Sequence, residues 1–260
     1  MKRNMIFMLL LSSFLVFCNA EANNAHLCNT SYKDIDDFRN ISFTENRKIE
    51  FSDENKTNTD SLWNKVFDYK VLEKGKISYL IISKNNVSKK FMMLHSESLL
   101  VLYDERSNLI FKGASKINTE RLYFPNKITA SSELKEGNTI YSANNLANLE
   151  LDKCWAECKS GYGIGEHVEF KMNGQGIFIF NGYLSGKKNC LYEKNSRVKE
   201  IEVIFLNDNS SKIYKIKDTP NPQFIPFGID YSGQVMIKFL DVYKGTKYKD
   251  MCLNSIILLH

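Results

Sequence analysis

The chain has 260 residues with 35 basic and 30 acidic side chains, which give a formal net charge of +5. This mild basic excess does not indicate nucleic acid as a partner, because nucleic-acid-binding domains concentrate a far larger one. At roughly 100–200 residues per domain, the length fits two domains.

The first twenty residues have the three parts of a secretory signal peptide. Two basic residues come first, an apolar run follows at 6–17, and the small residue Ala20 ends the segment. The apolar run is too short to span a bilayer comfortably. We expect cleavage after Ala20 or Ala22 and a protein that is secreted or held in the cell envelope. Lipid anchoring at Cys18 is the alternative, although the bulky Phe17 precedes it where lipoprotein signals prefer a small residue.

The mature chain is expected to have no transmembrane segment, because no later apolar run is long enough to cross a membrane. The apolar end at Ser255–His260 is expected to be a closing strand. Loss of residues 1–20 removes two basic residues and no acidic one, which leaves 33 basic against 30 acidic side chains and a net charge of +3.

Cysteine number and spacing bear on redox chemistry and metals. Export places the protein where disulfides persist, and five of the six cysteines remain after Cys18 is lost. Five is odd, so at least one thiol is free, intermolecular or bound to another partner. Cys154 and Cys158 lack the two-residue gap of zinc ribbons, and we predict no metal site. A disulfide is expected, without a defined pairing, among Cys154, Cys158, Cys190 and Cys252.

Residues 21–115 are predicted to form a small antiparallel β domain of unknown role. Its first part, 21–60, is polar with scattered apolar residues and predicts a short pair of strands or a loosely held arm. From Trp63 onward, short β-prone runs alternate with turn residues, which is typical of a meander. These runs lie at 66–72, 76–82, 91–94, 99–103 and 109–112. The regularity lapses at 116–127, which we interpret as a linker.

Residues 128–260 predict about eight short strands separated by Gly, Asn and Pro turns. No stretch of ten or more residues keeps a helical period. Gly176–Phe180 is apolar at successive positions, as expected of a strand between two layers. The pattern indicates an all-β fold, either a sandwich or a jelly roll. Six of the predicted strands lie at 168–172, 176–180, 199–205, 211–216, 234–242 and 253–259.

The stretch Cys154–Phe170 is the densest part of the chain in chemistry-bearing residues. It holds one of two tryptophans, two cysteines, and the glycines Gly161, Gly163 and Gly165. Glycine tolerates a positive φ and allows close approach of a backbone or a ligand. We therefore expect a tightly folded loop at one end of the sheet, as a structural corner or as a binding rim.

Eight short phrases in the second domain occur in a fixed order. They are Ala130–Ser132, Tyr141 with Asn144–Leu146, Cys154–Glu157, Gly161–Glu166, Asn181–Tyr183, Asn195–Lys199, Val242–Gly245 and Asp250–Ile256. Together they resemble the translocation domain of streptococcal-type NAD glycohydrolases, also described as an NADase-type glycan-binding domain. The resemblance covers residues 128–260. It implies a discoidin-like (factor 5/8 type C, galactose-binding-like) jelly-roll β-sandwich and a binding role.

Two departures from the family pattern concern acidic residues. The family has an Asp-Gly-rich turn before the tryptophan where this chain has Asn148–Lys153, and Ser-Glu before the last strand where it has Asn254-Ser255. A ligand site built on those acids is therefore not expected to carry over. Nothing in the first domain resembles the catalytic half of an NAD glycohydrolase, so the resemblance implies no NAD chemistry and no cofactor.

Sugar recognition needs flat apolar side chains for the C–H faces and fixed polar groups for the hydroxyls, on loops held by a rigid scaffold. The candidates are Trp155, Glu157, Tyr162, Glu166, Asn181, Tyr183, Asn195, Arg197 and Tyr243.

Each candidate has a structural alternative. Trp155 is better explained as a core tryptophan, since aromatic side chains dominate such cores. Arg197 suits a structural ion pair with Glu157 or Glu166, because a guanidinium binds a carboxylate with two parallel hydrogen bonds. Tyr183 and Asn181 are expected at the surface, as a ligand rim or a turn.

The sequence thus predicts an exported, non-catalytic protein whose second domain recognises glycan. One alternative is an envelope or secretion accessory protein that binds another protein. A second is a glycoside hydrolase with Glu157 and Glu166 as paired carboxylates. No further motif supports the hydrolase, and we predict that the chain is not an enzyme.

Overall fold

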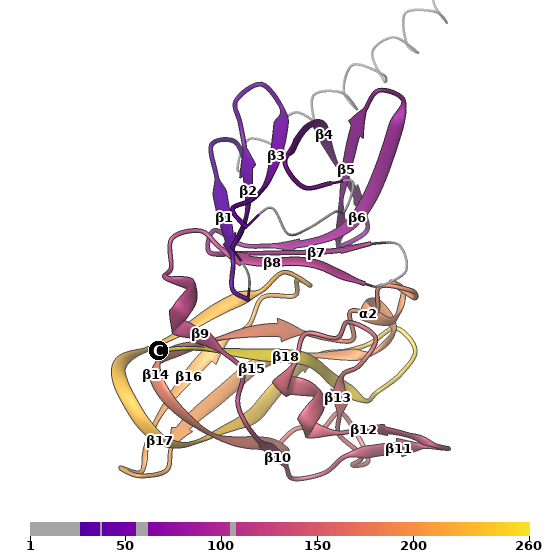
Figure 1. The fold of residues 1–260 in the computed structure, drawn as a ribbon. Coiled ribbons are helices and arrows are strands. Elements are labelled where there is room, and N and C mark those ends of the chain that lie inside the picture. The colour runs from indigo at the N-terminus through magenta and orange to yellow at the C-terminus, as the bar shows by residue number, and fades with distance from the viewer. Residues whose placement is uncertain (1–26, 37, 56–61, 105–107) are drawn as a thin grey trace, which may run out of the picture.

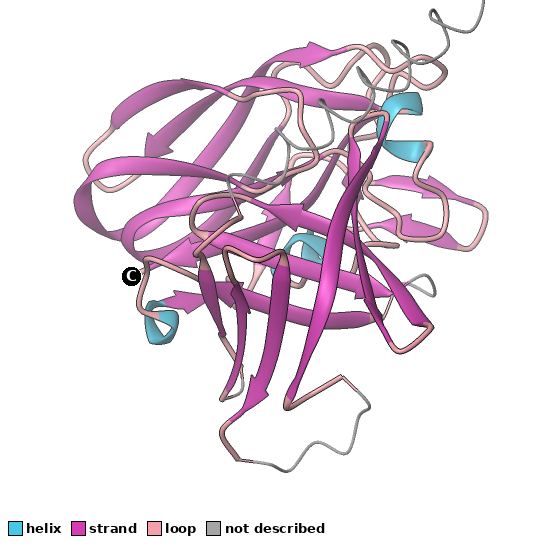
Figure 2. Cartoon of the chain, turned by 90° about the horizontal axis from the view of Figure 1, so that it is seen from above, coloured by secondary structure: helices cyan, strands magenta, loops and turns pink. Residues whose placement is uncertain are grey.

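A computed structural model of the chain describes residues 27–36, 38–55, 62–104 and 108–260. The predicted signal peptide, with Cys18, lies outside them. Strands make up nearly all of the regular structure, and the helices are single short turns (Figures 1 and 2). Across the described ranges, we find no helix with the length and apolar character that crossing a membrane requires. The protein is therefore all-β, as predicted.

The first domain is a closed, eight-stranded antiparallel barrel (Figure 1). Each strand pairs with the next, and β1 closes the ring by pairing with β8, Lys33 opposite Ala114 and Asp34 opposite Gly113. The strands are β1 (Ser31–Asp34), β2 (Arg39–Phe43), β3 (Lys48–Asp53), β4 (Lys65–Lys74), β5 (Ile77–Lys84), β6 (Val87–His95), β7 (Leu99–Asp104) and β8 (Leu109–Ala114).

The polar N-terminal segment is neither an isolated strand pair nor a loose arm. Its apolar residues alternate along β2 and β3, so that Ile41, Phe43, Ile49 and Phe51 all face the barrel core while their neighbours face outward. Phe51 packs edge-to-face against Trp63, with ring centroids 5.7 Å apart. Together with β1, these two strands supply three of the eight strands of the barrel.

The second domain is a sandwich of long, bent strands that enclose their own core. β14, β17, β15 and β18 pair in succession, and β14 also pairs with β18. The elements are η1 (Thr119–Arg121), β9 (Leu122–Tyr123), β10 (Ile128–Ala130), β11 (Leu134–Glu136), β12 (Thr139–Tyr141), η2 (Ala143–Ala147), β13 (Trp155–Ala156), β14 (His167–Asn181), α2 (Leu191–Lys194), β15 (Ser196–Phe205), β16 (Ser210–Lys215), β17 (Gln223–Tyr243) and β18 (Met251–Leu259).

Two details differ from the sequence prediction. The predicted linker contains η1 and β9, and β9 pairs with β18. The predicted strands at 168–172 and 176–180 form one strand, β14, whose register shifts between Gly174 and Gly176. A Cβ at Gly174 would lie 2.0 Å from the Leu259 carbonyl oxygen, so only glycine lets the bent strand pass β18 so closely.

The two domains share a hydrophobic interface in which the barrel sits against one face of the sandwich (Figure 1). In β14, Ile177 and Ile179 face the sandwich core, whereas Phe178 and Phe180 face the barrel. β7 is buried on both faces in the same way, because Leu100 and Leu102 point into the barrel and its other apolar residues point toward the sandwich. Strands buried on both sides lack alternation, which explains their continuous apolar sequence.

Polar contacts also cross this interface. Asn189 Nδ2 donates to Tyr79 Oη at 2.6 Å, and the Tyr103 hydroxyl donates to the Leu149 carbonyl oxygen. Burial raises the pKa of Tyr103, so its hydroxyl stays protonated as a donor.

Candidate functional site

Glu157 lies under the loop that carries Gly161, Gly163 and Gly165, which we refer to as the glycine loop. Its side chain is fully buried, and its carboxylate accepts the backbone N–H of Lys159 at 2.7 Å and of Met251 at 3.3 Å. Burial raises its pKa, and the two backbone hydrogen bonds oppose that rise. Gly163 lies directly over it, since a Cβ there would lie 2.4 Å from Glu157 Cγ. The loop is therefore a structural corner closed on a buried carboxylate.

Glu166, at the end of the same loop, is also engaged by the chain itself. Its Oε2 accepts the Ser131 hydroxyl at 2.7 Å and the Ser132 hydroxyl. Burial raises its pKa, but the two serine hydrogen bonds outweigh burial and lower the pKa below the ordinary value. Neither glutamate contributes to the lining of the pocket of about 410 Å³ beside Tyr183 that is described below.

Trp155 is a core residue. It is 0% exposed and stacks on Phe239, with ring centroids 5.2 Å apart and an interplanar angle of 26°. Its indole Nε1 donates to the Ser132 carbonyl oxygen at 2.9 Å. The structural alternative therefore holds for Trp155, whose face is not open to a ligand.

Asn181 and Arg197 are structural as well. The Asn181 side chain donates to the Val198 carbonyl oxygen at 2.7 Å and accepts the Val198 N–H at 2.9 Å, and so joins the end of β14 to β15. Arg197 binds Asp218 with Nε and Nη2, whereas the sequence predicted a pair with Glu157 or Glu166. The two residues are 0% and 5% exposed, so neither offers a surface to a ligand.

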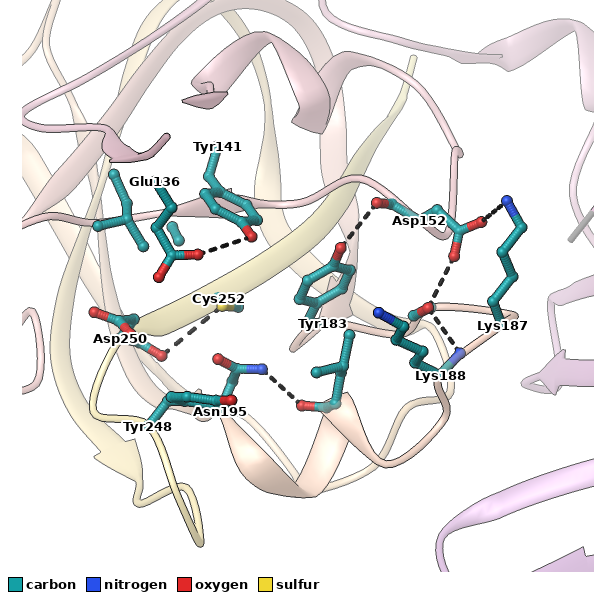
Figure 3. Close-up of a pocket in the computed structure, with 14 residues that line it drawn as sticks. Glu136, Tyr141, Asp152, Tyr183, Lys187, Lys188, Asn195, Tyr248, Asp250 and Cys252 are labelled. Atoms are coloured by element: carbon teal, nitrogen blue, oxygen red, sulfur yellow. Dashed lines mark hydrogen bonds and ion pairs between the residues drawn. The ribbon is translucent and has the colours of Figure 1, made fainter. Parts of the chain in front are cut away.

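A pocket of about 410 Å³ opens on the flank of the second domain (Figure 3). The β11–β12 hairpin, the loop before β13, the 183–195 segment and the start of β18 form its walls. Tyr141 and Tyr183 stand edge-to-face, with centroids 6.2 Å apart, over a floor that includes Ala156 and Cys252. Its lining residues are Leu134, Glu136, Tyr141, Asp152, Ala156, Tyr183, Ser185, Lys187, Lys188, Leu191, Asn195, Tyr248, Asp250 and Cys252.

Internal hydrogen bonds hold the pocket walls in place. Tyr183 Oη donates to the Asp152 carbonyl oxygen at 3.0 Å, and Tyr141 Oη donates to Glu136 at 3.1 Å. Asp152 also accepts the Ser185 hydroxyl at 2.8 Å and lies 3.2 Å from Lys187 Nζ. Burial, with the nearby Glu136, raises the pKa of Tyr141 to about 12, and burial also raises the pKa of Tyr183. Both phenols are therefore neutral donors at physiological pH.

The family model described as the NAD glycohydrolase translocation F5/8 type C domain matches residues 119–259, more than half of the chain. The chain belongs to this family. No curated protein matches it.

Several solved structures resemble this chain weakly. Arabinofuranosyltransferase AftD from Mycobacteria is 12% identical over 54% of this chain, which spans only 11% of that protein, with a TM-score of 0.39. CpGH89CBM32-5 from Clostridium perfringens was solved with GalNAc-beta-1,3-galactose. It is 11% identical over 52% of this chain and 94% of its own chain, with a TM-score of 0.39. A two-domain Bacteroides fragilis protein of unknown function is 11% identical over 71% of this chain and 59% of its own chain, with a TM-score of 0.31. At such TM-scores these likenesses carry no functional argument.

The pocket of the F5/8 type C domain contains two of the nine predicted ligand residues, Tyr183 and Asn195. Tyr162 and Tyr243 are half-buried and lie outside its lining, and Tyr243 Oη donates to the Ile216 carbonyl oxygen at 3.1 Å. The other five are buried as described above.

Sequence reasoning missed most of the pocket wall, although some signals were present. Tyr141 belongs to one of the family phrases, and Lys187 and Lys188 lie in the loop that follows β14, a few residues after Tyr183. The remaining wall residues with ionisable or aromatic side chains are Glu136, Asp152, Tyr248 and Asp250.

The structure shows no disulfide among the described residues. The five cysteines of the described ranges are all free, and Cys158 and Cys190 are exposed. Cys154, which directly precedes β13, and Cys252 of the adjacent strand β18 are buried together under the pocket. Within the described residues, no group of three or more His, Cys, Asp or Glu side chains is arranged to hold a metal ion.

Proposed function

We propose that this chain is an exported, non-catalytic protein whose F5/8 type C domain binds a glycan in the pocket beside Tyr183. The observation that carries the proposal is the edge-to-face pair of Tyr141 and Tyr183 in a pocket of about 410 Å³. A sugar ring presents C–H faces to aromatic side chains and hydroxyls to polar ones, and this pocket supplies both.

The polar groups of the pocket suit hydroxyl recognition. Asp250 and Lys188 line the cavity, and neither charged group has a hydrogen-bond or ion-pair partner among the described residues, so both can bind a ligand. Asn195 is fixed by its bond from Nδ2 to the Leu191 carbonyl oxygen at 2.9 Å, which leaves its amide oxygen as an acceptor. Rigid placement lowers the ordering cost of binding.

A non-catalytic role is supported by the state of the two glutamates that define the hydrolase alternative. Hydrogen bonds from the chain itself occupy both Glu157 and Glu166. A glycosidase needs its carboxylates free on either side of a scissile bond. Export is supported by the signal-like sequence at 1–20.

The test is a glycan array probed with the chain from Glu21 onward, followed by affinity measurements on any bound glycan. Tyr183→Ala is expected to weaken binding at least about tenfold, since stacking on one aromatic ring contributes on the order of 1 kcal/mol or more. Tyr243→Ala is the matched control, because its hydroxyl also bonds a backbone carbonyl but lies outside the pocket.

Two outcomes would overturn the proposal. If a folded Tyr183→Ala variant binds like wild type while Tyr243→Ala does not, the site is elsewhere. If no glycan binds, the protein-binding alternative replaces the glycan proposal.

A further inference from the structure

The loop between β17 and β18 carries an unusual concentration of positive charge. Residues 244–249 read Lys-Gly-Thr-Lys-Tyr-Lys, and we refer to them as the lysine loop. Lys244, Lys247 and Lys249 are all exposed. Part of this loop reaches the pocket, because Tyr248 and the following Asp250 line its wall (Figure 3).

Two of these lysines surround one aromatic ring. Lys244 Nζ lies 5.2 Å and Lys249 Nζ 5.9 Å from the ring centroid of Tyr162. Like charges held around one ring repel each other, and the attraction of each to the ring only partly offsets that repulsion. A bound anion would reduce the repulsion between the two lysines.

No carboxylate of the described residues neutralises the lysine loop through an ion pair. Asp241 lies close enough for Lys244 to help lower its pKa, but hydrogen bonds from Lys199 and the Val242 N–H are the larger causes, and Lys199 Nζ holds it at 2.5 Å. Among the described residues, the positive charges of the loop therefore have no acidic partner, and an external anion could bind them.

The loop is also held in a fixed shape. The backbone N–H groups of Lys247 and Tyr248 donate to the Lys194 carbonyl oxygen at 3.1 and 2.8 Å, and Thr246 N–H donates to that of Glu193 at 2.9 Å. Gly245 N–H donates to the Ser196 hydroxyl at 3.1 Å. The lysines thus extend from a preorganised backbone, which favours specific binding over a diffuse cloud of counter-ions.

Resting on the proposed glycan site, we infer that the preferred ligand is an anionic glycan that places an uncharged sugar in the pocket and its acidic groups along the lysine loop. The pocket itself has three carboxylates against two lysines, so it does not favour an acidic sugar. Lys247 and Lys249 are the sequence neighbours of Tyr248 in the pocket wall, so a polysaccharide that extends past Tyr248 would lie beside the lysine loop. The matching partner carries carboxylate or sulfate groups on a polysaccharide.

Pairs of polysaccharides that differ only in charge test this inference: polygalacturonate with its methyl ester, and carboxymethyl-dextran with dextran. Wild type should bind the charged member about tenfold or more tightly at about 50 mM salt, with the preference shrinking at about 500 mM. Lys244→Gln with Lys249→Gln should abolish the preference. Lys171→Gln with Lys215→Gln, exposed lysines on β14 and β16, removes the same charge elsewhere and should preserve it.

The outcomes separate this inference from the proposed function. Equal binding of both members of each pair, or binding of neither, overturns the anionic preference, while glycan-array binding that depends on Tyr183 still stands. If the two double variants lose the preference for the charged polysaccharide equally, the preference depends on the net charge of the protein and not on the lysine loop. That result also overturns the inference. Binding to phosphatidylserine vesicles without any charged-glycan preference would assign the lysine loop to a membrane surface instead.

Discussion

Arg197 and Asp218 form a two-pronged ion pair, with Nε to Oδ1 at 2.8 Å and Nη2 to Oδ2 at 3.1 Å. The side chains are 7% and 21% exposed, so both charges are largely removed from water. Tyr192 Oη donates to the same carboxylate at 3.1 Å, and Lys76 of the barrel pairs with it from the other domain. One carboxylate thus balances a buried guanidinium and joins the two domains.

Removal of this carboxylate should destabilise the protein strongly. Asp218→Asn leaves the Arg197 charge buried and unpaired, and we expect the free energy of unfolding to fall by about 3–5 kcal/mol. Denaturant titration measures the change. Asp241→Asn, which breaks the exposed pair with Lys199, is the control and should have a far smaller effect. Equal unfolding midpoints for Asp218→Asn and wild type would contradict this account.

The same pair predicts a loss of stability in acid. Burial raises the pKa of Asp218, but hydrogen bonds from Arg197 and Lys76 outweigh it and lower the pKa from 3.8 to about 2. Because the folded-state pKa lies below the unfolded one, the contribution is complete above about pH 4 and disappears as the pH falls to about 2. It amounts to about 2 kcal/mol.

Unfolding titrations of wild type and Asp218→Asn between about pH 5 and 2 test this dependence. The wild-type free energy of unfolding should fall more steeply over this range, so that the two curves converge in acid. Parallel curves would show that Asp218 titrates alike in the folded and unfolded chains.

The glycine loop offers a matched pair of substitutions. Gly163 and Gly165 both have positive φ, +68° and +91°, so Gly→Ala at either site costs about 1–2 kcal/mol of backbone strain. At Gly163 the new Cβ also clashes with buried Glu157, whereas at Gly165 it meets nothing within 4 Å. Gly163→Ala should therefore lower the thermal midpoint clearly more than Gly165→Ala. Equal midpoints would mean that the loop does not close on Glu157.

Thiol labelling of the native protein should separate the cysteines by burial. Cys158 and Cys190 are exposed, whereas Cys154 and Cys252 are buried. Burial raises the pKa of Cys154, which keeps it as an unreactive thiol. We expect iodoacetamide to modify Cys158 and Cys190 within minutes and Cys154 and Cys252 only after unfolding, as peptide mass spectrometry would show. Rapid native labelling of Cys154 would contradict the described packing.

Much of the fold follows from patterns that act over short distances. The turns and β-prone runs between Trp63 and Lys112 predict β4 to β8, and the doubly apolar Gly176–Phe180 predicts a strand between two layers. Closure of the barrel was not predictable, because β1 pairs with β8 some eighty residues away, and local alternation carries no information about that partner.

The site was harder to predict than the fold because residue type does not reveal which way a side chain points. Asn181 and Arg197 have the chemistry of ligand groups, yet a strand irregularity turns Asn181 inward and Asp218, which is remote in sequence, captures Arg197. Tyr183 was found because it borders a glycine where the strand ends. Asp152 and Lys188 come from loops whose positions depend on the assembled fold.

Burial of β7 on both faces has a thermodynamic consequence for the whole molecule. Its side chains belong to two cores at once, so unfolding of either domain exposes apolar side chains of the other to water. Heating should therefore give one cooperative calorimetric transition rather than two. Either domain expressed alone would expose an apolar surface that favours aggregation.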